Sequence, residues 1–155
     1  MPKINFFQAS RRMHRDAVFL AQDGALDRTA GAGHFFGLGG ECGLKYLLLL
    51  CGGLTRDSAT GDLQMAGRRR PHLDEIIDAS GLVSSYSTAV ASHTNVKYFA
   101  TLPGLGGLST WKVIFRYFDT SHADYPEADE PKWEAAAKEI QTALDQAQMD
   151  GQPIY

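Results

Sequence analysis

The stretch AGAGHFFGLGGECGLKYLLL, residues 30–49, decides the fold class of this 155-residue chain. Its apolar residues recur at spacings of three and four and show no strand-like alternation, so we expect one helix over residues 27–51, capped by Asp27. So broad an apolar surface is typical of a helix at the centre of a bundle or in a subunit interface. The expected inner stripe consists of Phe35, Gly39, Cys42, Tyr46 and Leu49, with Phe36, Gly43, Leu47 and Leu50 beside it.

Glycines interrupt this predicted helix at four positions, and each costs about 1 kcal/mol of helix stability relative to alanine. Such a cost is tolerable where the missing side chain lets another helix approach closely, so we expect tight helix packing at these positions. No strand precedes the glycines, which argues against a dinucleotide-binding loop. The four are Gly37, Gly39, Gly40 and Gly43.

Both ends of the chain also have helical periodicity. Residues 4–23 carry one apolar face, and Gly24 ends that segment. Asp129 or Glu130, followed by Pro131, opens a last helix. The first face contains Phe6, Ser10, Met13, Ala17 and Leu20, whereas the last contains Trp133, Ala136, Ala137, Ile140, Leu144 and Ala147.

The segment between these helices is more broken. We expect a polar loop over 55–70, a short helix over 72–79 with Pro71 at its first position, and mostly helix over 82–100. A break at 103–107 precedes a helix that Ser109 or Thr110 caps and that runs to Phe118. Four long and one or two short helical segments, with no convincing strand, predict a single domain over 1–155: an all-α, antiparallel up-and-down bundle of four to six helices.

The charge is uneven along the chain. From Asp119 onward there are nine acidic residues against two lysines, which excludes a general nucleic-acid coat and limits any RNA contact to a local patch. The one basic run, at residues 68–70, either holds phosphate or belongs to a solvated loop.

Features that are missing from the sequence indicate the cellular compartment and argue against a metal site. No targeting segment is visible, and the longest apolar stretch, residues 44–54, is too short to cross a bilayer. Cys42 and Cys51 fall on opposite faces of one helix and cannot bridge, so we expect a reducing, cytoplasmic location. The histidines have no metal-ligand spacing, so no metal or cofactor is expected.

Two strings give the chain a family resemblance. Glu41, Cys42, Leu44 and Lys45 form a Glu-Cys-x-Leu-Lys string, and residues 111–122 read WKVIFRYFDTSH. Over roughly residues 6–147 the chain resembles the HEPN family (higher eukaryotes and prokaryotes nucleotide-binding domain). The resemblance implies a helical bundle that forms a homodimer.

Many members of that family are metal-independent ribonucleases with an Arg-x(4–6)-His motif at the dimer interface, and several are toxins paired with a nucleotidyltransferase-type partner. Arg116 and His122 match the motif, with five residues between them. The resemblance therefore implies that these two are catalytic. Tyr117 stands where members often have a polar residue, and Tyr125 lies one position beyond the tyrosine that a partner can modify; both are candidate substrate-binding residues.

The residue types suit RNA cleavage. An imidazole can move a proton during attack by the RNA 2′-hydroxyl, and a guanidinium stabilises charge on phosphoryl oxygens. Six positions on an unbroken helix would separate Arg116 and His122 by about 120°, so they converge only at a helix break or between two subunits. Glu41 and Lys45, four positions apart, form either a surface ion pair or part of a substrate-binding interface groove.

Three functions remain open from the sequence. The first is a metal-independent endoribonuclease with a toxin or defence role, acting as a homodimer. The alternative is a non-catalytic HEPN domain that binds a nucleotide or a nucleotidyltransferase-type partner protein. A third, suggested by the aromatic and small residues of 30–49, is a bundle with a small-molecule pocket.

Overall fold

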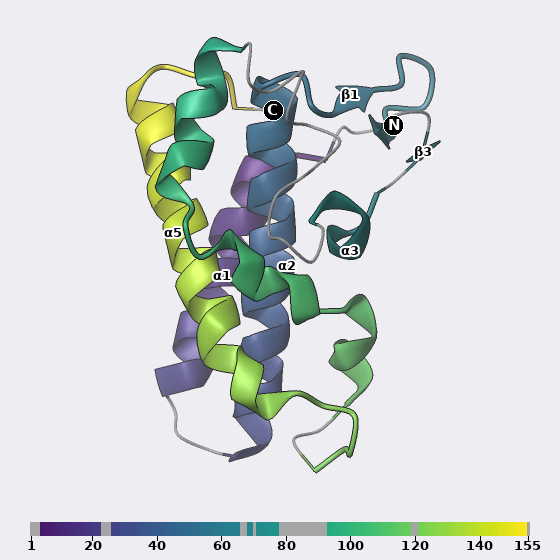
Figure 1. Ribbon diagram of the computed structural model, residues 1–155, viewed down its shortest axis with the longest axis vertical. Coiled ribbons are helices and arrows are strands. Elements are labelled where there is room, and N and C mark those ends of the chain that lie inside the picture. Colours follow the sequence, from purple (N-terminus) through teal and green to yellow (C-terminus); the bar gives the residue numbers. More distant parts are fainter. Residues whose placement is uncertain are drawn as a thin grey trace.

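Three long helices lie side by side along the long axis of the molecule (Figure 1). They are α1 (Phe6–Gln22), α2 (Leu26–Leu50) and α5 (Glu130–Met149), and their presence confirms the predicted all-α class. The computed structural model describes residues 4–22, 26–65, 68–69, 71–77, 93–118 and 121–154. Helix α2 already includes Asp27, so the prediction that this residue caps it was wrong.

The three helices do not all alternate in direction. Phe7 packs edge-on against Tyr46, with ring centroids 5.2 Å apart, and Leu20 lies next to Gly31, so α1 runs antiparallel to α2. Gly33 lies beside Glu130 and Gly43 beside Ile140, so α2 and α5 run in the same direction. The up-and-down prediction was therefore wrong for α5, because the chain between α2 and α5 returns along the bundle before α5 begins (Figure 1).

The glycines of α2 are where its neighbours come closest, as predicted. A Cβ at Gly37 would lie 2.1 Å from Trp111 Nε1, and one at Gly43 would lie 2.4 Å from Ile140 Cγ2. Both distances are far inside van der Waals contact, so no side chain fits there.

The inner face of α2 is rotated from the one expected. Three of the five stripe residues, Phe35, Cys42 and Leu49, are only half-buried. The flanking positions are buried instead, because α1 and α5 pack on both sides of the helix. The most buried side chains of α2 are Phe36, Leu44, Tyr46, Leu47 and Leu48.

A small sheet occupies the segment predicted to be a loop. Strands β1 (Thr55–Arg56), β2 (Leu63–Met65) and β3 (Arg68–Arg69) pair antiparallel in that order. Asp57 closes the first hairpin, since its carboxylate accepts the N–H groups of Ala59 and Thr60 at 2.9 and 2.8 Å. The prediction of no strand was wrong, because strands of two or three residues are too short to show periodicity.

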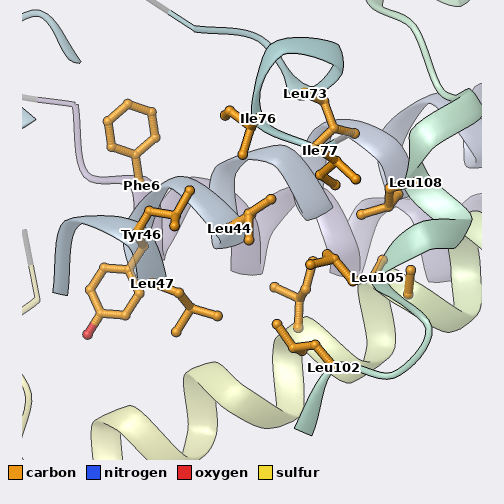
Figure 2. Close-up of a cluster of buried hydrophobic side chains, with 14 of the residues drawn as sticks. Phe6, Leu44, Tyr46, Leu47, Leu73, Ile76, Ile77, Leu102, Leu105 and Leu108 are labelled. Atoms are coloured by element: carbon orange, nitrogen blue, oxygen red, sulfur yellow. The ribbon is translucent and has the colours of Figure 1, made fainter. Parts of the chain in front are cut away.

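Helix α3 (Leu73–Ile76) is shorter than expected, and Pro71 lies two residues before it, not at its first position. The predicted extension to residue 79 and most of the predicted 82–100 helix lie outside the described residues. Leu73, Ile76 and Ile77 direct their side chains toward α2 around Leu44 (Figure 2). The segment thus adds to the core despite its length.

Short 3-10 helices replace the expected fourth long helix. They are η2 (Thr94–Thr101), η3 (Leu105–Thr110), η4 (Val113–Tyr117) and η5 (Glu127–Asp129). Helix η3 begins within the predicted break, and Thr110 ends it instead of capping the next helix. Lys112 precedes η4 without a side-chain cap, so the Ser109 or Thr110 cap was wrong.

The predicted core residues of α5 are buried, and Asp129 and Pro131 open that helix as expected. Trp111 and Trp133 are 1% and 0% exposed, so both belong to the core. Cys42 and Cys51 are free thiols. Among the described residues, no helix is both long and apolar enough to cross a membrane.

Candidate functional site

Arg116 lies in η4 with its side chain exposed. Its guanidinium donates a hydrogen bond to the Tyr117 hydroxyl and lies over that ring, with Cζ 4.5 Å from the centroid. Tyr117 is itself 67% exposed. The pair is therefore a planar cation beside an exposed aromatic ring, an arrangement that suits phosphate and a stacked base.

His122 is exposed on the loop that follows η4. Its ring stacks on Phe118, with centroids 3.8 Å apart and planes 5° apart. The backbone N–H of Asp124 donates to His122 Nδ1 at 3.2 Å. In a neutral imidazole the accepting nitrogen carries no proton, so Nε2 is the donor of this ring.

A second imidazole, His34 on α2, belongs to the same region. Its ring lies tilted against Trp111, with centroids 5.6 Å apart and planes 31° apart, and its Nδ1 is buried with no hydrogen-bond partner among the described residues. Burial lowers the pKa of His34, and the nearby positive charge of Arg116 lowers it further. Both effects favour the neutral form of the His34 imidazole.

No sequence motif points to His34, because it is one polar residue on an apolar helix. One feature of the sequence could have pointed to it. His34 lies three positions before Gly37 and therefore on the same face of the helix, and Gly37 is the residue against which Trp111 packs. No contact joins Arg116 directly to His122 among the described residues.

Glu41 and Lys45 form a buried ion pair, 5% and 8% exposed, with Nζ 2.5 Å from Oε1. The other carboxylate oxygen accepts the backbone N–H of Leu73 at 3.2 Å, and His72 Nδ1 lies 3.5 Å from Oε1. The surface alternative for this pair was therefore wrong. The pair ties α3 to α2, and only His72, at the edge, is exposed.

A cavity of about 240 Å³ lies between this cluster and η4. Its wall includes His72 and Leu73 on one side and Trp111, Lys112 and Ile114 on the other. The cavity therefore connects the edge of the Glu41 cluster with the element that carries Arg116, and it offers room for a small group beside two basic side chains.

Tyr125 is placed differently from Tyr117. It is 7% exposed, and its hydroxyl donates to Glu130 Oε1 at 2.5 Å. Burial raises the pKa of Tyr125, and the Glu130 carboxylate raises it further; burial also raises the pKa of Glu130. In this conformation the hydroxyl is not accessible to a modifying enzyme.

The remaining groups that could carry chemistry are a cysteine thiol, the arginine run and the potential metal ligands. Burial raises the pKa of the Cys42 thiol to about 11, with Glu41 adding to the effect, so the thiol is protonated at neutral pH. The side chains of the arginine run at 68–70 lie outside the described residues. No group of three or more potential metal-ligating side chains occurs among the described residues.

Comparison with known proteins adds no assignment: no protein-family model matches the chain, and no curated protein or solved structure matches it significantly. The resemblance to the HEPN family stays a prediction, and the geometry around Arg116 carries the functional argument.

Proposed function

We propose that this protein is a metal-independent endoribonuclease of the HEPN type that acts as a homodimer in a toxin or defence role. The observation that carries the proposal is the position of Arg116, exposed on η4 over the ring of Tyr117, while His34 lies against Trp111 two residues before η4. We place the protein in the cytoplasm, where the free thiols of Cys42 and Cys51 stay reduced.

In the proposed reaction, the 2′-oxygen of RNA attacks the adjacent phosphorus and the bond to the 5′-oxygen breaks. The neutral ring of His34 accepts the 2′-hydroxyl proton, and His122, in its imidazolium form and with Nδ1 no longer accepting from Asp124, gives an Nε2 proton to the leaving oxygen. One proton then passes through solvent from His34 to His122 and restores both rings. Arg116 stabilises the charge on the phosphoryl oxygens. The products are a 2′,3′-cyclic phosphate and a 5′-hydroxyl, so atoms and charge balance without a metal.

Support for the homodimer comes from η4 itself. Val113, Ile114 and Tyr117 are 38%, 45% and 67% exposed, so apolar side chains flank Arg116 in water. Two copies that met through η4 would cover them and bring two sets of Arg116 and His122 to one groove. Ile114→Glu is therefore expected to give a monomer in light scattering and to lower RNA cleavage.

The test is cleavage of a labelled RNA in EDTA by the wild type and by the Arg116→Ala and His122→Ala variants. Each variant should lose about 100-fold or more in rate. His93→Ala is the matched control, because His93 Nδ1 accepts the N–H of Asn95 at 3.1 Å just as His122 accepts that of Asp124. RNA that stays intact with folded wild-type dimer would reject the proposal.

One contact favours the non-catalytic alternative. The Tyr117 hydroxyl already holds the Arg116 guanidinium, which leaves it less free for a phosphoryl group. A domain that binds a nucleotide or a nucleotidyltransferase-type partner would leave RNA intact, and its ligand would raise the melting temperature. Tyr117→Phe separates the two, since it frees the guanidinium and should increase cleavage only in an enzyme.

A further inference from the structure

The imidazole of His14 lies where α1 packs against α2 and α5. Its ring contacts Phe36 of α2 edge-on, with centroids 5.6 Å apart. A Cβ at Gly39 would lie 3.2 Å from the backbone nitrogen of His14, so the backbones of α1 and α2 come close at this level. About one helical turn earlier, Ser10 accepts a hydrogen bond from Gln141 of α5 at 2.8 Å. His14 therefore belongs to the region in which three helices meet.

One nitrogen of this ring has no partner. His14 Nδ1 is buried and makes no hydrogen bond with a described residue. A neutral imidazole tolerates this, because it can carry its single proton on Nε2 and leave Nδ1 as an unused acceptor. An imidazolium has a proton on both nitrogens, so the charged ring would bury an N–H donor that no described acceptor meets. The packing of α1 thus favours the neutral ring.

The charges around His14 act in the same direction. Burial lowers the pKa of His14, and the positive charges of Arg11 on α1 and Lys138 on α5 lower it further. Asp145 of α5 forms an ion pair with Arg11 and offsets part of that charge. From α2, the aromatic ring of Phe36 faces the imidazole. A proton on His14 is therefore opposed from both charged neighbours.

Turning the ring outward would not remove this opposition. A cavity of about 940 Å³ lies beside α1 and borders His14, and Arg11, Arg12 and Arg15 line it. No carboxylate of a described residue lines that cavity. An imidazolium that turned into the cavity would lose its contact with Phe36 and would approach further cations. Protonation of His14 is consequently unfavourable as long as α1 stays packed.

We propose that His14 makes the packing of α1 sensitive to pH, so that in mildly acidic conditions α1 separates more readily from α2 and α5. Once α1 separates, water solvates the ring and its pKa returns to about 6.5. Because the pKa of the packed ring lies below that value, the stabilisation of packed α1 is complete above about pH 7 and is lost as the pH falls below about 6.5. None of these residues belongs to η4 or the loop after it, so the inference is independent of the proposed ribonuclease activity.

Hydrogen–deuterium exchange of the α1 amides at about pH 7.5 and about pH 5.5, corrected for the intrinsic exchange rate, tests the inference. The equilibrium constant for opening of α1 should rise about three- to tenfold at the lower pH. In His14→Asn, which cannot be protonated and keeps an acceptor near the Nδ1 position, it should change by less than about twofold. His93→Asn is the matched control and should behave as the wild type, since His93 is also half-buried and asparagine keeps the acceptor that caps η2.

Lys138→Glu gives a second test that leaves His14 in place. Lys138 is exposed, and the substitution replaces a repelling charge by an attracting one, so the rise at the lower pH should become smaller. An opening constant of α1 that is equal at both pH values in the wild type overturns the inference, as does an equal rise in His14→Asn. A fall at the lower pH also overturns it, because the charged ring would then have gained an acceptor such as Gln141 Oε1. Equal opening constants for α1 and α5 amides would show that the whole protein unfolds together and contradict separate release of α1.

Discussion

The imidazole of His122 lies flat on the ring of Phe118, with centroids 3.8 Å apart. Phe118 in turn contacts Phe115, whose ring stacks on Trp133 of α5. A proposed catalytic group on an exposed loop is thereby connected through aromatic contacts to a fully buried residue of the bundle. This connection fixes the ring plane of His122 against the core.

Phe118→Leu should therefore slow RNA cleavage by about tenfold without unfolding the protein, because His122 loses the surface that orients it. The measurement is the single-turnover cleavage rate together with the melting temperature. Phe99→Leu is a suitable control, since Phe99 is also half-buried but lies in η2. Equal rates for Phe118→Leu and the wild type would show that stacking does not position His122.

The buried pair of Glu41 and Lys45 gives a prediction about stability. Glu41→Gln should destabilise the protein by about 3–5 kcal/mol, because it leaves the Lys45 charge buried without its partner. Replacing both, with Glu41→Leu and Lys45→Met, should recover much of that loss. Urea unfolding measures both changes. A Glu41→Gln variant as stable as the wild type would contradict the burial of this pair.

The glycine contacts of α2 predict opposite outcomes for one substitution at two positions. Gly43→Ala should cost about 1–3 kcal/mol, since its Cβ would lie 2.4 Å from Ile140 Cγ2. Gly31→Ala should be neutral or stabilise by up to about 1 kcal/mol, because its nearest neighbour, Leu20 Cδ1, would be 3.7 Å away. Chemical denaturation of the two variants checks this, and similar losses in both would refute the close approach of α5.

The contacts of Asp150, near the C-terminus, predict that the stability of the protein depends on pH. Hydrogen bonds from Lys97, Tyr98 and Gln146 lower the pKa of Asp150 to about 2. Because this lies below the usual value of about 3.9, folding favours the ionised form. The stabilisation is complete above about pH 4 and is lost as the pH falls toward about 2.

Asp150→Asn should consequently be less stable than the wild type at neutral pH and equally stable near about pH 2. Urea unfolding across that range measures the gap between the two proteins. A gap that stays constant as the pH falls would show that the carboxylate charge is not responsible.

The long helices were predictable because each repeats its pattern over many turns. Helix α5, for example, carries its apolar stripe from Trp133 to Ala147 and has Pro131 at its start. The small sheet was not predictable, since β1 and β2 form through the carboxylate of Asp57 and the positive φ of Gly61, not through alternating residues. The direction of α5 depends on contacts far apart in the sequence, which periodicity does not encode.

The candidate functional residues also include some that the sequence predicts and some that only the fold reveals. Arg116 and His122 came from a short motif, but His34 was overlooked because only the fold brings it against Trp111, two residues before the helix that carries Arg116. The burial of Gln141, in contrast, could have been predicted from the sequence. Gln141 is a polar residue four positions after Ala137 and three before Leu144, on the apolar stripe of its helix, which indicates a buried polar role.

The most direct test of the ribonuclease account is a structure of the homodimer with a short RNA whose reactive 2′-hydroxyl is replaced by hydrogen. The account predicts that Arg116 and His122, from one copy or from two, both lie within about 3 Å of a single phosphate group. Arg116 and His122 on separate surfaces, with RNA bound elsewhere or not at all, would contradict it.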